Sequence, residues 1–377
     1  MRAVGGIIDT AEALVLTGPR HLEHRELAVP DVGDDDGILA IEACGLCGTD
    51  HEQFTGHIAA PFAFIPGHEV VGVVERLGAR AAERWGVGEG DRVAVEVFQS
   101  CRTCGHCRSG NYRRCERNGM ATMYGFVDVE REPGLWGGYA SHLYLGPDSM
   151  LLPTPDGMDP VLATVFNPLG AGIRWGVTVP GTQPGDVVAV LGPGIRGLSV
   201  AAAAKDAGAA FVMVTGLGAR DHPRLEAAGS FGADLALDVS NEDPVRRLKA
   251  ATGGLADIVV DVTAKAPAAP AQAVRLTRPG GTIVLAGTRG TGEAPGFDPD
   301  HIVYKELRIL GALGVDAPAY RAALELLESG RYPFAGLPRR VAGFDDLAPL
   351  ISTMAGEGED DVPVHAVFAP GRNRGDP

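Results

Sequence analysis

The chain has 377 residues, of which 48 are acidic and 33 are basic, giving a formal net charge of −15 at pH 7. This length exceeds the roughly 100–200 residues of one ordinary domain and predicts two domains, and a hydrophobic content of 45% is enough for a full core. The excess negative charge would repel phosphate backbones and anionic lipid headgroups, which disfavours nucleic acid and membranes as partners.

The start of the chain and its cysteines indicate a cellular compartment. A short apolar patch, Val4 to Ile8, is interrupted by Asp9 before it reaches the length of a signal peptide, and no later run approaches the ~18 apolar residues of a membrane span. All six cysteines fall between Cys44 and Cys115, a clustering typical of metal sites rather than disulfides. We therefore expect a cytoplasmic protein with reduced thiols.

Up to about residue 155 the sequence predicts a β-rich domain. Val70 to Glu75 and Asp91 to Val95 are rich in β-branched residues and are bounded by glycine and proline, as strands are. Just before the first of these strands, Cys47-Gly48-Thr49-Asp50-His51 is followed by Pro66-Gly67-His68-Glu69.

A thiolate and an imidazole from two segments, with fewer than four obvious ligands, are typical of a catalytic zinc that keeps one position for substrate. Asp50 could orient the ring of His68 through its second nitrogen. The alternative is that His68 is an ordinary core histidine and Cys47 a small buried hydrophobe. Their joint occurrence favours the metal.

A second cysteine cluster follows in a single loop, with thiols at Cys101, Cys104, Cys107 and Cys115. Four thiolates close a tetrahedral zinc shell and leave no open position, so we expect a structural zinc. Four free thiols are an alternative. A zinc ribbon for nucleic acid is another, although the net charge opposes it.

From about Gly185, strands alternate with alanine-rich helical segments, which predicts a parallel sheet covered on both faces. The expected strands are 187–191, 211–214, 258–261 and 282–285, and the expected helices are 198–208 and 223–232. A further strand at 307–310 and an amphipathic helix at 317–330 follow, after which we expect irregular structure.

The first strand and helix of this region flank Gly192-Pro193-Gly194-Ile195-Arg196-Gly197, the glycine fingerprint of a dinucleotide site. Gly192 permits the turn, Gly194 lets a pyrophosphate approach the backbone at the helix N-terminus, and Gly197 lets the helix pack on the strand. Ile195 is expected to bind the cofactor with these glycines. An ordinary strand-to-helix turn is the alternative.

The end of the next strand bears on the choice of nucleotide. An acid usually binds the ribose 2′-hydroxyl of NAD there, whereas Gly216 occupies that place here and Arg220 follows. We therefore expect NADP(H) to be favoured over NAD(H). Asp221 opposes this interpretation, and Arg220 could be merely solvated.

Together, Cys47-Gly-Thr-Asp, Gly67-His68-Glu69, the four-cysteine loop and the glycine fingerprint resemble the zinc-dependent alcohol/polyol dehydrogenases of the medium-chain dehydrogenase/reductase superfamily. The resemblance implies an α/β fold with a β-rich GroES-like catalytic domain and a Rossmann domain with a doubly wound parallel sheet. We expect the first at 1–180, with 314–377 returning to it, and the second at 181–313.

The resemblance also assigns roles to single residues. It implies that Cys47 and His68 bind a catalytic zinc, that Glu69 can replace a ligand, and that Thr49 and His51 relay the proton. The family usually supplies a third ligand, Cys, Glu or Asp, where this chain has Asn167. An amide oxygen is a weak zinc ligand. Asn167, Glu69 or a water could complete the shell, and Asn167 could equally be a turn residue before Pro168.

The implied activity is NAD(P)-dependent oxidation of a small alcohol, or the reverse reduction, by a homodimer or homotetramer with two zinc ions per chain. A zinc-independent reductase of an activated double bond and a non-catalytic nucleotide-binding protein with structural zinc only are the alternatives. The sequence does not identify the substrate, because the large apolar side chains that could line its pocket could equally belong to the core. These are Phe54, Phe98, Met120, Tyr124 and Trp136.

Overall fold

The computed structural model describes residues 9–264, 266–288, 293–357 and 361–372, so the patch Val4 to Ile8 lies outside the described residues. The chain forms two compact units. Unit 1 is Met1–Val165 with Leu337–Pro377, and unit 2 is Phe166–Gly336. These divisions differ from the expected boundaries at 180/181 and 313/314 because of helices described below.

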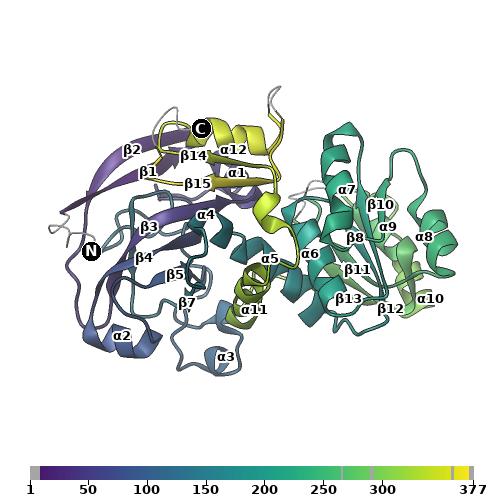
Figure 1. The fold of residues 1–377 in the computed structure, drawn as a ribbon, viewed down its shortest axis with the longest axis horizontal. Helices are drawn as coiled ribbons and strands as arrows, with labels where there is room; N and C mark the ends of the chain where they lie inside the picture. The colour runs from purple at the N-terminus through teal and green to yellow at the C-terminus, as the bar shows by residue number, and fades with distance from the viewer. Residues whose placement is uncertain (1–8, 265, 289–292, 358–360, 373–377) are drawn as a thin grey trace. The chain divides into compact units, whose positions relative to one another are not determined.

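Unit 1 is β-rich and is built around a seven-stranded sheet with the order β14-β15-β3-β4-β5-β7, in which β6 also pairs with β3 (Figure 1). A separate hairpin joins β1 to β2. The predicted strands near residues 70 and 91 are confirmed as β4 and β5. The strands are β1 (Thr10–Gly18), β2 (His21–Ala28), β3 (Gly37–Leu46), β4 (Glu69–Leu77), β5 (Arg92–Val95), β6 (His142–Leu145), β7 (Leu151–Pro153), β14 (Arg339–Ala342) and β15 (His365–Phe368).

The core of unit 1 takes residues from both faces of its central strands, so consecutive residues of β3, β4 and β6 are buried. Ile38, Leu39, Val70, Val74 and Leu143 are each at most 1% exposed. Short helices connect the strands. They are α1 (Gly48–Phe54), α2 (Ala79–Trp85), α3 (Gly105–Arg108), α4 (Pro160–Ala163) and α12 (Leu347–Met354), with a 3-10 turn η1 (Tyr112–Arg114).

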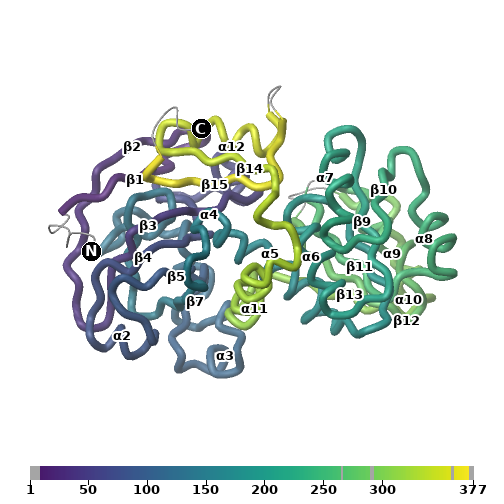
Figure 2. The backbone as a smooth tube through the Cα atoms, in the orientation of Figure 1, coloured from purple at the N-terminus to yellow at the C-terminus, as the bar shows by residue number. Residues whose placement is uncertain are grey.

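The expectation of irregular structure after residue 330 is wrong, because β14, α12 and β15 lie there. The two strands have four residues each, too few for a clear alternation. Strand β15 is held by antiparallel pairing with β3, in which Phe368 is opposite Cys44. Figure 2 shows this yellow strand running beside β3. Pairing over such a distance leaves no local signal.

Unit 2 contains the predicted parallel sheet, with six strands in the order β10-β9-β8-β11-β12-β13, of which all but β10 were expected. Its helices connect successive strands, and together with unit 1 this confirms the α/β class. Helix α6 begins at Ile195, three residues earlier than expected, because Gly194 serves as its N-cap. The strands are β8 (Val187–Leu191), β9 (Phe211–Gly216), β10 (Leu235–Asp238), β11 (Ala256–Asp261), β12 (Thr277–Leu285) and β13 (Arg308–Gly311). The helices are α6 (Ile195–Asp206), α7 (His222–Ala228), α8 (Pro244–Thr252), α9 (Ala269–Leu276) and α10 (Pro299–Lys305).

Two further helices explain why unit 2 is longer than the expected Rossmann domain. Helix α5 (Phe166–Ile173) packs against α6 and against α11 (Ala317–Glu328). The packing is close: a Cβ on Gly170 would lie 2.5 Å from Cδ1 of Tyr320, and one on Gly172 would lie 2.4 Å from the carbonyl carbon of Ser199. Both helices therefore belong to unit 2.

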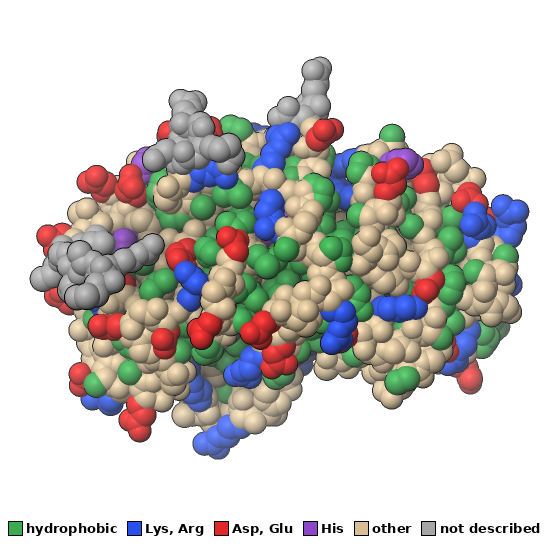
Figure 3. Space-filling view, in the orientation of Figure 1, with side chains coloured by type: hydrophobic (Ala, Val, Ile, Leu, Met, Phe, Trp, Pro, Cys, Tyr) green, Lys and Arg blue, Asp and Glu red, His purple; other side chains and the backbone are tan. Residues whose placement is uncertain are grey.

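No helix in the described ranges has both the length and the apolar character needed to cross a membrane. On the face drawn in Figure 3, acidic and basic side chains are interspersed and do not form one large patch of either sign.

Candidate metal and nucleotide sites

Helix α1 places the first candidate metal ligand. Cys47 is its N-cap, and the carboxylate Oδ2 of Asp50 accepts a hydrogen bond of 2.8 Å from the Cys47 amide. This contact satisfies one of the amide groups that a helix start leaves without an intrahelical partner. The position of the Cys47 thiol is thus fixed by the start of the helix.

Three candidate ligands meet at this point of unit 1. Sγ of Cys47 lies 3.3 Å from Nε2 of His68, and a carboxylate oxygen of Glu69 lies within 4.8 Å of both. All three residues are buried. Gly67 makes this possible, because its φ of +91° favours glycine and a Cβ there would lie 2.7 Å from the Tyr139 ring.

Behind His68, two buried polar atoms face each other without a hydrogen bond. Nδ1 of His68 lies 3.9 Å from Oδ1 of Asp50, the two side chains are 8% and 0% exposed, and neither atom has a partner within the described part of the chain. Leaving such atoms unpaired costs about 1–3 kcal/mol each. A metal on Nε2 would place the proton on Nδ1, facing the carboxylate, as in carboxylate–histidine–zinc arrangements. The donor set fits zinc and argues against an ordinary core histidine.

The two expected relay residues lie further along α1. Thr49 is half-buried, and His51 is only 6% exposed. They are two residues apart on a helix, so their side chains do not face each other. Nε2 of His51 lies 2.8 Å from Oε1 of Glu357, a residue that no sequence pattern singled out because 306 positions separate it from His51.

The four-cysteine loop also converges. The sulfur atoms of Cys101, Cys104, Cys107 and Cys115 all lie within 4.8 Å of one another, and all six cysteines of the chain are free thiols. The amide of Cys104 donates to Sγ of Cys101 at 3.3 Å, and the amide of Cys107 donates to Sγ of Cys104 at 3.5 Å. Amide donors of this kind stabilise thiolates. The four cysteine thiolates together fit a closed zinc shell.

The loop also prepares one thiol for ionisation. The hydroxyl of Thr103, 3.4 Å away, and nearby amides lower the pKa of Cys101 to about 5, which favours its thiolate at neutral pH. Burial acts in the opposite direction on Cys107 and raises its pKa to about 12. A divalent cation would favour the thiolate of both residues.

Asn167, the departure from the family pattern, lies on α5 in unit 2. It is 4% exposed, and its Nδ2 donates to the hydroxyl of Tyr320 at 2.9 Å. The amide is therefore fixed by a partner on α11 in its own unit, and its service as a zinc ligand stays a prediction.

The glycine fingerprint forms a tight turn between β8 and α6. Gly192 has a φ of +103°, and a Cβ on Gly197 would lie 1.8 Å from the Gly192 carbonyl oxygen. Gly194 differs, because its φ is −64° and no atom lies within 4 Å of the place of a Cβ. Gly192 and Gly197 are thus required by the turn, whereas Gly194 leaves open space at the start of α6, where Ile195 is the first residue.

The end of β9 is crowded and basic. A Cβ on Gly216 would meet Cβ of Asp221 and Cγ of Pro193, both at 2.9 Å. Asp221 accepts from the Leu217 amide at 2.9 Å and pairs with Arg224 at 3.3 Å. Burial lowers the pKa of Arg224, and the charge of exposed Arg220 lowers it as well. Two guanidinium groups therefore lie near this strand end, and the two acids beside it are both engaged. Asp221 is held as described, and Asp238, at the end of the neighbouring β10, accepts from the amides of Gly218 and Ser240, each at 2.9 Å.

Asp261 is a site-supporting residue that the sequence analysis missed. It ends β11 fully buried, and its Oδ1 accepts from both the amide and the hydroxyl of Thr263, at 3.0 and 2.6 Å. A Cβ on Gly192 would lie 3.1 Å from the Thr263 side chain. Asp261 thus holds the loop that borders the fingerprint turn, and an acid directly after an apolar strand was the available signal.

The apolar side chains considered for a substrate pocket lie mostly in the core. Phe54, Tyr124 and Trp136 belong to the main core of unit 1 and Phe98 to a smaller one, whereas Met120 is 56% exposed. This favours their interpretation as core residues.

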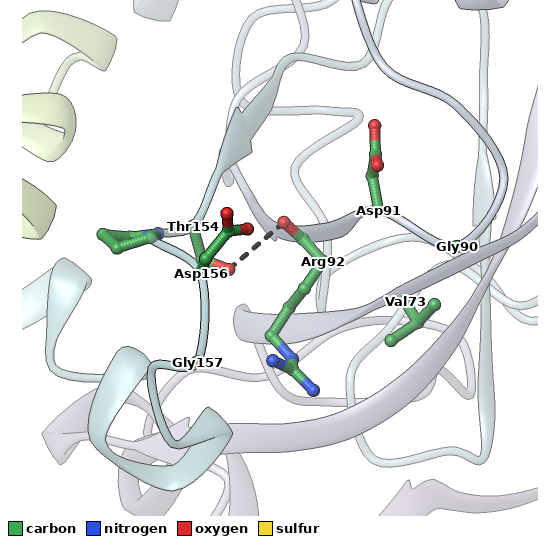
Figure 4. A pocket seen from close by; sticks show the side chains of 8 residues that line it. Val73, Gly90, Asp91, Arg92, Thr154, Asp156 and Gly157 are labelled. Carbon is green, nitrogen blue, oxygen red and sulfur yellow. Dashed lines mark hydrogen bonds between the residues drawn. The ribbon is translucent and has the colours of Figure 1, made fainter.

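A separate pocket of about 170 Å³ in unit 1 is lined by none of the predicted site residues (Figure 4). Asp91 and Asp156 are among its lining residues, and the Thr154 hydroxyl donates to the carbonyl oxygen of Arg92 at 3.2 Å. The guanidinium of Arg92 is paired with Glu42, with a contact of 2.9 Å. Arg92 is the one cationic side chain among the residues that line the pocket, and its charge is neutralised by Glu42. We therefore assign the pocket no part in the chemistry.

Comparison with known proteins places these sites in context. Two family models match: an alcohol dehydrogenase GroES-like domain over residues 33–156 and a zinc-binding dehydrogenase over residues 197–329. A protein of Mycobacterium tuberculosis (strain ATCC 25618 / H37Rv) named "Probable alcohol dehydrogenase adh" is 66% identical, covering 95% of this chain and 98% of its own length.

Two more distant relatives extend the comparison. The sorbitol dehydrogenase of Bacillus subtilis (strain 168) is 30% identical over 85% of this chain and 86% of its own length. The crystal structure of a Sinorhizobium meliloti 1021 protein bound to NADP has a TM-score of 0.80 at 26% identity, covering 96% of this chain and 99% of that one.

Proposed function

Because the chain belongs to the family of zinc-binding alcohol dehydrogenases, an oxidoreductase family acting on CH–OH groups, we propose that it oxidises a small alcohol, or reduces the matching carbonyl, with NADP(H) and a catalytic zinc. A second, structural zinc is proposed for the four-cysteine loop. The six free thiols suit a reducing compartment, and we place the enzyme in the cytoplasm.

The observation that carries the proposal is the cluster of Cys47, His68 and Glu69 together with the unpaired Asp50–His68 contact behind it. A zinc-independent reductase has no use for a buried thiol and imidazole 3.3 Å apart. A non-catalytic protein with structural zinc only would need the four-cysteine loop but not this second cluster.

The chemistry supplied from outside the chain is Lewis acidity from zinc, which lowers the pKa of an alcohol oxygen, and hydride acceptance by the nicotinamide. Cys47 and His68 would hold the metal, with Glu69 within reach as a third ligand. Asp50 would fix the orientation of the His68 ring by accepting a hydrogen bond from its Nδ1–H group. The Thr49 hydroxyl would receive the proton from the alcohol and pass it towards His51.

In unit 2, the residues of the fingerprint would bind and orient the dinucleotide. The open space at Gly194 admits a pyrophosphate to the amides at the start of α6. Arg220 and Arg224 at the end of β9 would attract a ribose 2′-phosphate, and Gly216 provides no acid to bind a 2′-hydroxyl in its place.

The proposal is tested by Cys47→Ala and His68→Ala, with Cys44→Ala as the matched control because Cys44 is a buried thiol outside the cluster. We expect the first two variants to lose one zinc per chain and about three orders of magnitude in alcohol-dependent reduction of NADP+, since Lewis acidity contributes several kcal/mol. Nucleotide affinity, measured by titration, should stay unchanged.

Metal analysis beside steady-state rates separates the alternatives. Near-normal turnover in either variant would reject the zinc mechanism and favour the zinc-independent reductase. A wild-type protein that binds NADP(H) yet oxidises no polyol, aryl alcohol or cyclic alcohol would favour the non-catalytic alternative.

A further inference from the structure

The imidazole of His51 contacts a carboxylate from the far end of the chain. His51 lies on α1, four residues after Cys47, and its Nε2 is 2.8 Å from Oε1 of Glu357, which follows α12. The His51 side chain is 8% exposed and that of Glu357 is 36% exposed. Both residues belong to unit 1.

Arg20, in the turn between β1 and β2, fixes that carboxylate. Its two terminal nitrogens donate to the two oxygens of Glu357, each at 2.8 Å, which is the bidentate geometry of strong arginine–carboxylate pairs. The guanidinium also lies 5.7 Å from the centre of the Phe54 ring on α1. The hydrogen bonds from Arg20, and then that from His51, lower the pKa of Glu357 to about 2.

An ionised carboxylate can only accept hydrogen bonds. The hydrogen between His51 and Glu357 must therefore lie on Nε2, and in the neutral ring the lone pair is on Nδ1. Within the described residues, Nδ1 of His51 has no hydrogen-bond partner of its own. The ring is thus prepared to accept one proton at one defined atom.

We propose that Glu357, held by Arg20, is a positioning residue that keeps His51 in the Nε2–H tautomer, so that Nδ1 accepts the proton released in alcohol oxidation. This inference rests on the proposed function. Because Thr49 and His51 do not face each other on α1, the proton passes between them through an intervening hydroxyl or water. His51 becomes an imidazolium with a proton on each nitrogen, and Glu357 stays ionised throughout.

The tautomer can be measured without any turnover. We expect ¹⁵N NMR of the wild-type protein to show Nε2 of His51 protonated and Nδ1 unprotonated in the neutral ring. In Glu357→Gln the amide can either accept from or donate to Nε2, so a mixture of tautomers is expected. Glu26→Gln removes an exposed carboxylate of the same unit and should change nothing.

A double-mutant cycle tests the link to catalysis. We expect Glu357→Gln to lower kcat about tenfold with little change in KM, and to have no further effect when His51→Gln is already present, because the carboxylate acts only through the ring. If Glu357 had only a structural role, the reductions of kcat caused by Glu357→Gln and His51→Gln would multiply in the double variant.

The possible failures can be distinguished. Multiplying losses, or mixed tautomers of His51 in the wild-type protein, would overturn this inference and leave the proposed function standing. A wild-type protein without any alcohol-dependent turnover would overturn the proposed function, and this inference with it.

Discussion

Two arginines at the end of β9 bear on the choice of nucleotide, and they differ in environment. Arg224 is paired with Asp221 and its side chain is 14% exposed, whereas Arg220 is exposed. A guanidinium that reaches into solvent lies where a bound phosphate can approach it, whereas a mostly buried guanidinium beside a carboxylate is less accessible. Arg220 is therefore the residue whose removal should report on the 2′-phosphate.

We expect Arg220→Ala to weaken NADP(H) binding roughly five- to a hundredfold, the range of one charge-assisted contact, and to leave NAD(H) binding unchanged. Arg321→Ala, which removes an exposed arginine from α11, serves as the control. Titration of both nucleotides into the three proteins gives the answer. Tighter NAD(H) than NADP(H) binding by the wild type would reject the preference but not the zinc mechanism. The crowding around Gly216 makes an acid at that position a less clean test.

At the scale of elements, two glycines of the turn between β8 and α6 are needed for different reasons. Gly197 is needed for the structure of the turn, and Gly194 for the binding of the nucleotide. Gly197 cannot carry a Cβ without displacing the backbone of Gly192, whereas Gly194 has a helix-compatible φ and open space. Neighbouring glycines of one motif thus serve different purposes.

Gly194→Ala should keep the thermal stability of the wild type and weaken both nucleotides, because its methyl group occupies the space open to the pyrophosphate. Gly197→Ala should lower the free energy of unfolding by about 1–3 kcal/mol through overpacking. Gly254→Ala, also in open space, should change neither quantity. Thermal denaturation and nucleotide titration measure the two effects, and a stable Gly197→Ala variant would show that the turn can relax.

The four-cysteine loop has only short helical turns of its own, so metal is expected to hold it. We expect Cys104→Ser to remove about one zinc per chain and to lower Tm, since a structural site contributes folding free energy directly. Cys44→Ser should retain the full zinc content. An unchanged metal content and Tm in Cys104→Ser would show that the loop does not bind structural zinc.

The sequence predicted those elements whose signal is local. Five of the six strands of unit 2, which are apolar runs between helices, and strand β4 in unit 1 were recognisable because their patterns lie within a few residues. Strand β10 was missed, because only one of its four residues, Leu237, is buried. Strand β15 and residue Glu357 were not, because each is defined by a partner more than 300 residues away in the chain. The ligand candidates Cys47 and His68 were found from residue type and spacing, but the unpaired atoms behind them required coordinates.

For the molecule as a whole, one buried histidine links stability to pH. His365 is 2% exposed, and burial, together with the charge of Arg339, lowers its pKa to about 3. Unfolding restores a pKa near about 6.5. Between these values the unfolded chain binds one more proton than the folded one, so stability is present above about pH 6.5 and falls as the pH decreases towards 3.

This effect should appear as a slope of up to about 1.4 kcal/mol per pH unit in the free energy of unfolding between pH 6.5 and 5. His365→Gln should remove that part of the slope, and His57→Gln, at an exposed position, should not. Urea denaturation at several pH values measures it, and metal loss at low pH contributes equally to all three proteins. Parallel slopes in wild type and His365→Gln would show that the folded state accommodates the protonated ring.

The pairing of β15 with β3 also orders events during protein synthesis. The ribosome releases β3 long before β15, with all of unit 2 made in between. Unit 2 is continuous in sequence and can complete its sheet while the chain is still growing, whereas the sheet of unit 1 exposes the edge of β3 until the last segment arrives. The sheet of unit 1 therefore stays incomplete until β15 has been synthesised. A chain that stops before residue 365 would leave β3, the strand that leads to Cys47, without one of its neighbours.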